Sequence, residues 1–324
     1  MLLCSSSQAA PQPLPPVITT PSSAAPQTGE GLNTLFTDIP IWGYVLIGFM
    51  AALLVVLLLL LSRFLQHRRL ANKTVSIGNL HNIGNRSSQQ DYFVISDLSN
   101  QEQYNQHGLL TVVADGMGGL EGGAEISAMT ATYLLQNYYK LSPELDIASR
   151  LFCMVNNAQT EVRRYLDSNG SGMSGTTVVV AVVHNHQLFF NSVGDSRICL
   201  VRNGKLTQLN REHNYAADLD EMAARGEISL EQAQTDPQRK SLTSYIGINE
   251  RLQVDRNISP IALEQNDRLL LMTDGVFGTL DDNEILQALA DPNVQYAAEK
   301  LEQMVLSKGK PSQDNFTAVI IGGV

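Results

Sequence analysis

An uninterrupted run of 21 apolar residues, from Ile41 to Leu61, constrains this chain of 324 residues more than any other feature. About 20 apolar residues in a helix are enough to cross the hydrocarbon core of a bilayer. A buried helix of a soluble domain is rarely so long and so uniformly apolar. The run is also too long, and begins too far from Met1, to fit a cleaved signal peptide. We therefore expect one transmembrane helix over residues 41–62.

The charges on either side of the run predict its orientation. Residues 1–40 contain no Lys or Arg. Four basic residues follow the run, namely Arg63, Arg68, Arg69 and Lys73. Because positively charged flanks stay on the cytoplasmic side, the part of the chain after the run is expected to be cytoplasmic.

Composition then divides the chain into four parts. Residues 1–40 are rich in Pro, Ser, Thr and Gln and are predicted to form a disordered tail. After the span over 41–62, residues 63–75 are expected to be a basic juxtamembrane linker. Residues 76–324 have the composition of a globular domain. The net charge of −10, with no basic stripe in that domain, argues against nucleic acid as a partner.

Cysteine usage points to a reducing compartment. Cys4, Cys153 and Cys199 show neither paired nor metal-type spacing. Two of them, Cys153 and Cys199, fall in segments that we expect to be part of the core, where free thiols are common.

Patterns within residues 76–324 group strands with strands and helices with helices, which predicts the α+β class with antiparallel sheets. Helices are expected near residues 122–139, 143–166, 215–233 (broken at Gly226), 281–290 and 294–306. Four short β segments between residues 176 and 209 are joined by turn signals, so we expect them to form an antiparallel meander. Further strands are expected at residues 91–96, 108–114, 251–258 and 267–273 and in the last residues.

Four acidic residues of this domain stand at the ends of predicted strands. Asp91 and Asp314 each open an apolar run, whereas Asp115 and Asp274 each close one and are followed by glycine. An Asp-Gly pair alone is most simply a turn. If the strands of Asp91 and Asp115 pair antiparallel, and those of Asp274 and Asp314 likewise, all four carboxylates meet at one rim. Such a group would repel strongly without cations between its members, so the sequence predicts a metal site.

The predicted ligands are carboxylates without a His or Cys cluster, which suits hard cations such as Mg²⁺ or Mn²⁺. Two such ions can activate water and hold the oxygens of a phosphate ester. Arg86, five residues before Asp91, is placed to offer a guanidinium fork to that phosphate. An exposed loop arginine without a ligand is the other interpretation of Arg86.

Six motifs occur in the order typical of one enzyme family. They are Arg86-Ser-Ser-Gln-Gln-Asp91, Asp115-Gly-Met-Gly-Gly119, Ser174-Gly-Thr-Thr177, Val193-Gly-Asp-Ser-Arg197, Thr273-Asp-Gly275 and Gln313-Asp-Asn315. The chain thus resembles the PPM-type (type 2C) metal-dependent serine/threonine protein phosphatases, over about residues 76–324. The stretch 225–233, followed by Asp236-Pro-Gln-Arg239 and Ile246-Gly247, resembles the flap segment of the bacterial branch. The resemblance implies a four-layer α-β-β-α sandwich, with two antiparallel sheets flanked by helices.

The resemblance also implies roles for the residues of the rim. Asp115, Asp274 and Asp314 would bind one metal ion, and Asp91 would support the site through water. Asp115 and the backbone carbonyl of Gly116 would bind a second ion. Two Mn²⁺ or Mg²⁺ ions would activate a hydroxide that attacks phosphorus directly, without a covalent phospho-enzyme.

Arg86 would hold the substrate phosphate, so Arg86, Asp91 and Asp115 are the expected catalytic residues. Several positions depart from the family pattern. Gln89 stands where the family commonly has Asn, and Gln90 where many members have Glu. Met117 stands where some eukaryotic members have a candidate acid histidine, so we assign no side chain that role.

Asp195 matches a family ligand for a third metal ion. Gly278, however, stands where a second ligand of that ion is often Asp. The sequence therefore does not decide whether a third metal ion binds.

We expect a phosphatase with a single transmembrane helix, in a bacterial inner membrane with its catalytic domain in the cytoplasm. It would act in signal transduction on phosphoproteins that are targets of a Ser/Thr kinase. The alternative is a catalytically silent regulatory module that binds phosphoproteins through the same fold. The presence of all four acids favours the enzyme. The sequence does not predict the substrate protein, the choice between Mn²⁺ and Mg²⁺, or the oligomeric state.

Overall fold

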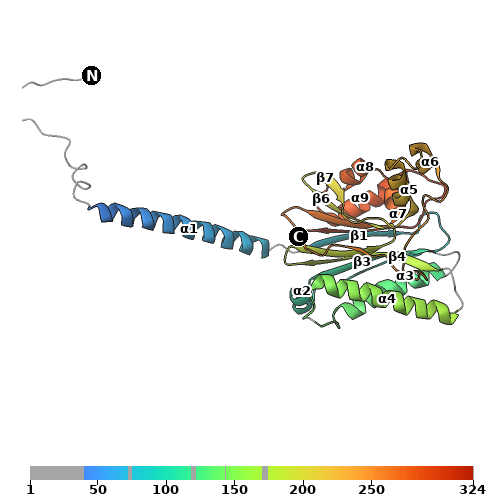
Figure 1. Ribbon diagram of the computed structural model, residues 1–324, viewed down its shortest axis with the longest axis horizontal. Helices are drawn as coiled ribbons and strands as arrows, with labels where there is room; N and C mark the ends of the chain where they lie inside the picture. The colour runs from blue at the N-terminus through green and yellow to red at the C-terminus, as the bar shows by residue number, and fades with distance from the viewer. Residues whose placement is uncertain (1–39, 72–74, 118–121, 143, 170–173, 324) are drawn as a thin grey trace, which may run out of the picture. The chain divides into compact units, whose positions relative to one another are not determined.

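The computed structural model describes residues 40–71, 75–117, 122–142, 144–169 and 174–323 (Figure 1). The chain divides into two compact units, residues 1–68 and 69–324. The predicted disordered tail, apart from Pro40, lies outside the described residues. So do Gly118 and Gly119 of the motif that begins at Asp115.

Helix α1 (Ile41–Ala71) lies in the first unit as far as Arg68, and its last residues belong to the second. The large apolar side chains from Ile41 to Leu61 are exposed on its surface. Of the helices in the described part of the chain, one stretch, Ile41–Arg63, is long and apolar enough to cross a membrane by length and composition. The helix continues beyond this stretch into the residues predicted as the juxtamembrane linker.

The second unit is built on two antiparallel sheets, which we call the first and the second sheet. The first sheet has the order β1 (Ser76–Asn82), β11 (Phe316–Gly322), β10 (Arg268–Met272), β6 (Arg197–Arg202) and β7 (Lys205–Gln208). The second has the order β2 (Asp91–Ile95), β3 (Leu109–Met117), β4 (Gly175–His184), β5 (Gln187–Val193) and β8 (Asp255–Arg256), with β9 (Ile261–Ala262) also paired to β5.

Helices lie outside the two sheets. They are α2 (Gln101–His107), α3 (Gly122–Tyr138), α4 (Ile147–Asn169), α5 (Tyr215–Ala224), α6 (Leu230–Thr235), α7 (Asp274–Phe277), α8 (Asp282–Ala288) and α9 (Val294–Ser307). Figure 1 shows α3 and α4 beside one sheet and α8 and α9 beside the other, with the sheets between them. The predicted α+β class with two antiparallel sheets and helices is therefore confirmed.

Three clusters of buried apolar side chains hold these elements together. One lies between the sheets, where Val113 and Val179 of the second sheet join Leu271 and Val319 of the first. The second joins α3 and α4 to the second sheet, and the third joins α8 and α9 to the first sheet. Strand β3 contributes alternate residues to two clusters, and because both of its faces are buried it reads as a continuous apolar run.

The predicted meander is wrong at its middle step. β4 pairs with β5 and β6 pairs with β7, but β5 belongs to the second sheet and β6 to the first. Residues 194–196 therefore cross from one sheet to the other. Gly, Asp and Ser favour a tight turn whether the next strand pairs with the last one or leaves its sheet, so the sequence alone does not separate the two cases. The crossing carries Asp195 to the functional site described below.

Smaller differences concern segments with weak patterns. The strand expected over 251–258 is limited to β8, and the helix expected over 215–233 is two helices, α5 and α6, with Gly226 at φ +75° between them. β1 and α2 were not predicted, because neither has a clear apolar period. Cys199 is buried as expected, whereas Cys153 is exposed.

Candidate functional site

Both predicted strand pairings at the rim are confirmed. β2 pairs antiparallel with β3, and Asp91 lies directly opposite Asp115 in the register. β10 pairs antiparallel with β11. Asp274 follows the end of β10, and Asp314 precedes the start of β11. The four acids therefore come from the same end of the two sheets.

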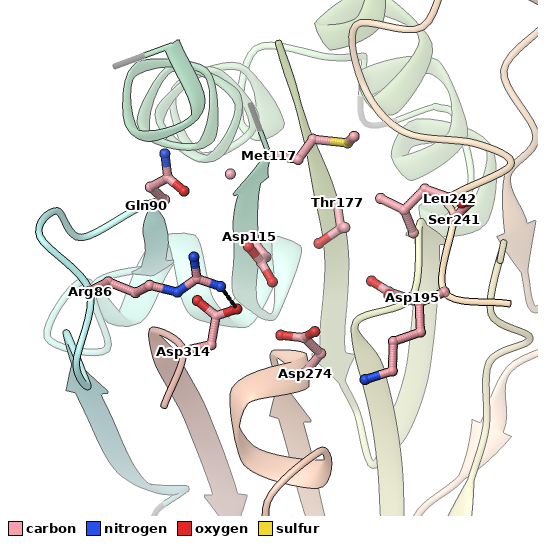
Figure 2. Close-up of a pocket in the computed structure, with 12 residues that line it drawn as sticks. Arg86, Gln90, Asp115, Met117, Thr177, Asp195, Ser241, Leu242, Asp274 and Asp314 are labelled. Atoms are coloured by element: carbon pink, nitrogen blue, oxygen red, sulfur yellow. Dashed lines mark hydrogen bonds and ion pairs between the residues drawn. The ribbon is translucent and has the colours of Figure 1, made fainter. Parts of the chain in front are cut away.

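A pocket of about 470 Å³ opens at this end. Six of the seven residues predicted for the site line it: Arg86, Asp115, Gly116, Asp195, Asp274 and Asp314. In Figure 2 the carboxylates of Asp115, Asp274 and Asp314 lie near one another in the pocket, and Arg86 lies beside Asp314. The seventh residue, Asp91, is 2% exposed and is not among the lining residues.

The loop that carries Arg86 is held by the side chain of Asn315. Its amide nitrogen donates to the backbone oxygens of Ile83 and Ser88, at 2.8 and 3.1 Å. Its amide oxygen accepts from the backbone N–H of Gln90 at 2.8 Å. One residue beside Asp314 thus fixes both ends of the segment that presents Arg86.

Arg86 forms an ion pair with Asp314, with 2.6 Å between Nη2 and Oδ2. The two side chains are 55% and 39% exposed. An ion pair that is open to solvent in this way contributes only about 0–1 kcal/mol, so a phosphate or a cation can compete for either partner. The guanidinium group has further N–H donors besides the one that Asp314 accepts.

Asp91 is buried opposite Asp115 in the strand register, in an environment that disfavours its charge. Its Oδ2 accepts a hydrogen bond of 2.8 Å from the hydroxyl of Thr273. Its Oδ1 is buried and has no hydrogen-bonding partner among the described residues. Burial raises the pKa of Asp91 to about 7, against the opposite effect of its hydrogen bonds. A buried carboxylate oxygen without a donor is a position that favours a cation or an ordered water.

The lining acids are also held above their ordinary pKa values. Burial, followed by repulsion from Asp91 and Asp274, raises the pKa of Asp115 well above its usual range. Burial and the charges of Asp274 and Glu212 raise the pKa of Asp195 to about 7. For Asp274, burial and Asp314 raise the pKa. Positive charge brought close to these carboxyl groups would lower their pKa values again, because it stabilises the charged form.

The donors present suit a hard divalent cation. The pocket offers carboxylate oxygens from four acids, and the unpartnered oxygen of Asp91 is buried opposite Asp115 in the strand register. All-oxygen donor sets of this kind favour Mg²⁺ or Mn²⁺. Within the described part of the chain, no three His, Cys, Asp or Glu side chains are already grouped as a metal cage. Two features therefore suit this pocket to a divalent cation: its donors are carboxylate oxygens, and their negative charge is not compensated by enough positive charge nearby.

Sequence reasoning did not place three residues that line the opposite side of the pocket, Lys240, Ser241 and Leu242. They follow α6 in the predicted flap segment and return to the domain through a bridge between Leu242 and Asn214. The adjacent basic pair Arg239-Lys240 was the one sequence feature that could have indicated an anion-binding role. The local sequence does not predict that this segment folds back to the pocket, because that depends on tertiary contacts.

Comparison with known families agrees with these features. A family model for protein phosphatase 2C matches residues 78–308. The serine/threonine phosphatase Stp of Listeria monocytogenes is 28% identical to the chain over 221 residues, which cover 65% of this chain and 83% of that protein.

Two solved structures show the same fold. The serine/threonine phosphatase of S. agalactiae matches with a TM-score of 0.66 and 25% identity, over 77% of this chain and 99% of that one. The catalytic domain of the serine/threonine phosphatase PstP in complex with two manganese ions matches with a TM-score of 0.61 and 23% identity, over 76% of this chain and 97% of that one.

The raised pKa of Asp91 predicts how pH changes the stability of the protein when chelator removes metal. The ordinary pKa of an aspartate, 3.8, applies in the unfolded chain, whereas the folded value is about 7. Between these values the folded state binds more protons than the unfolded state, so its stability falls as pH rises from about 4 to about 7. Thermal unfolding of the chelated protein measures this slope.

Asp91→Asn should reduce the slope, because the amide does not titrate. Asp282→Asn, the same change at an exposed residue of α8, should leave it as in the parent protein. An equal slope in the parent protein and in Asp91→Asn would contradict the raised pKa.

Proposed function

Since this chain belongs to the protein phosphatase 2C family of metal-dependent serine/threonine protein phosphatases, we propose that it is a membrane-anchored member that hydrolyses phosphoserine and phosphothreonine at the rim pocket. The observation that carries this proposal is the convergence of Asp115, Asp274, Asp314 and Arg86 on one pocket from four separate strand ends and loops.

The proposed metal-binding residues follow from that convergence. Asp115, Asp274 and Asp314 would hold one Mn²⁺ or Mg²⁺ ion, and Asp115 with the Gly116 carbonyl a second. When bound, two such ions supply charge neutralisation and the activation of water for attack on phosphorus. The two manganese ions of the PstP catalytic domain support a site for two ions.

Asp91 would act on the site through water. Its bond from Thr273 fixes the orientation of the carboxylate, and its second oxygen stays available on the buried side. A third ion would take Asp195 as a ligand. Asp195 does line the pocket, but Gly278 has no side chain to offer, so the proposal requires only two ions.

Arg86 is proposed to bind the substrate phosphate. Its loop is fixed by Asn315, and its exposed guanidinium keeps donors for phosphate oxygens beyond the one bound to Asp314. A guanidinium positioned in this way orients the phosphate and offsets charge that develops on its oxygens.

The lining residues favour hydrolysis by water over a covalent route. Neither His nor Cys is among the described residues that line the pocket. The hydroxyl of Thr177 is engaged with that of Ser196 at 2.7 Å, and the carboxylate opposite it in the strand register, Asp115, is proposed as a metal ligand. Because no His lines the described pocket, and Asp115, Asp274 and Asp314 are proposed to bind metal, we assign proton donation to the leaving group to water.

The remaining chain is proposed to anchor the enzyme. In this proposal residues 41–62 are the transmembrane helix, 63–75 the basic linker and 76–324 the phosphatase domain. The exposed apolar surface of α1 and the basic residues after it support this arrangement. The domain then faces the cytoplasm of a bacterial inner membrane and acts on phosphoproteins produced by a Ser/Thr kinase.

Asp115→Asn should lower Mn²⁺-dependent hydrolysis of a phosphothreonine peptide by a factor on the order of 100 or more, since it removes a ligand shared by both ions. Release of inorganic phosphate measures the loss. Asp282→Asn, which makes the same change outside the pocket, should retain the activity of the parent protein. Full activity in Asp115→Asn would contradict the proposed metal site.

Phosphopeptide binding without any turnover in the parent protein would favour the silent regulatory module instead.

The membrane anchor is tested by fractionation of cells that express the full chain. The protein should remain with membranes after high salt and alkaline carbonate and should leave them in detergent. Replacing Leu53 and Leu57 by Asp should shift the protein toward the soluble fraction, because each charge at the centre of a span costs about 3 kcal/mol. Recovery of the parent protein in the carbonate supernatant would contradict the anchor.

A further inference from the structure

The pocket has a second cation that the proposed chemistry does not use. Lys240 lines it together with Arg86. Arg86 is already engaged with Asp314. The Lys240 side chain is exposed, and no described carboxylate lies within ion-pair distance of its ammonium group. An exposed lysine at the mouth of an acidic pocket is available to an incoming anion.

The backbone around Lys240 is fixed on both sides. Before it, the guanidinium of Arg239 binds both carboxylate oxygens of Asp220, at 2.8 and 2.9 Å, and the backbone oxygen of Ala233 at 3.0 Å. After it, the backbone oxygen of Ser241 accepts from the N–H of Tyr215 at 2.9 Å. These contacts tie the segment to α5 and α6. The backbone of Lys240 is therefore held in one position, which reduces the conformational entropy lost when its side chain binds a ligand.

Lys240 lines the same pocket as Asp115, Asp274 and Asp314. Its charge therefore acts on an anion that binds in this pocket beside the acids.

Figure 2 shows Arg86 on one side of Asp115 and Asp274, and Ser241 and Leu242, which directly follow Lys240 in the chain, on the other. Met117 and Leu242 add apolar surface on that second side. A phosphorylated side chain with its phosphate at Arg86 and the acids would share the pocket with Met117, Leu242 and Lys240.

From this placement, and on the basis of the proposed phosphatase function, we infer that Lys240 is a specificity residue. It binds an anionic side chain, a carboxylate or a second phosphate, that flanks the phosphoresidue in the substrate. The carboxylate and the second phosphate have in common a negative charge that the exposed ammonium group of Lys240 can bind. Such a contact is weakened by salt, because it lies at the solvent-exposed mouth of the pocket.

The test uses the full chain with Mn²⁺ and three phosphothreonine peptides of one sequence. The residue beside the phosphothreonine is glutamine, glutamate or phosphoserine. The measured quantity is kcat/KM for removal of the threonine phosphate, and the preference is its ratio to the value for the glutamine peptide. The parent protein should prefer the two anionic peptides by about twofold to fivefold, and less so at high salt.

Lys240→Gln should bring this preference close to one, and Lys240→Arg should restore it because the charge is kept. Lys205→Gln removes the same charge from an exposed residue of β7 outside the pocket and should keep the parent preference. A larger preference for phosphoserine than for glutamate identifies a second phosphate as the favoured anion. The reverse order identifies a carboxylate, and either order supports the inference.

Three results would overturn it. The first is a parent protein that shows no preference. The second is a preference that persists in Lys240→Gln. The third is an equal loss on all three peptides in Lys240→Gln, which would place Lys240 on the scissile phosphate or on the metal site. The proposed function fails separately, if the parent protein hydrolyses none of the peptides in a metal-dependent manner.

Discussion

Repulsion among carboxylates at one end of the two sheets is the interaction on which the account of this protein depends. Burial and mutual repulsion hold the pKa of Asp115 well above its usual range, and burial brings that of Asp91 to about 7. A fold that served only stability would not gather these groups, because each unpaired buried charge destabilises it. Divalent cations resolve this conflict, and they also supply what phosphate hydrolysis requires.

The architecture explains how distant residues reach this point. Antiparallel pairing brings the start of β2 beside the end of β3, and the start of β11 beside the end of β10. Packing of sheet against sheet then sets the two pairs of acids face to face. The crossing after β5 and the return of the flap segment add Asp195 and Lys240 to the same pocket. Arg86 and Lys240 both line this pocket with the acids, and we propose that Arg86 binds the phosphate and Lys240 a neighbouring anion of the substrate.

Much of this could be predicted from sequence, because the signals are local. Asp115 and Asp274 each close an apolar run and precede glycine. The sequence predicts one shared rim on the condition that their strands pair antiparallel with those of Asp91 and Asp314, and the structure shows both pairings. The failures have tertiary causes. The turn at Asp195 has the residues of a hairpin, yet its strands join different sheets. Lys240 lies in a polar segment whose return to the pocket depends on a bridge to Asn214.

The comparisons place the chain in its family, while the roles of single residues rest on the geometry of the pocket. The most direct test of the central claim is calorimetric titration of the metal-free protein with Mn²⁺ in two buffers of different ionisation enthalpy. The account predicts saturable binding of two ions per chain, with release of protons because the raised carboxyl pKa values fall when the ions bind. Asp115→Asn should lose this binding. Absence of Mn²⁺ binding, or binding that Asp115→Asn leaves unchanged, would contradict it.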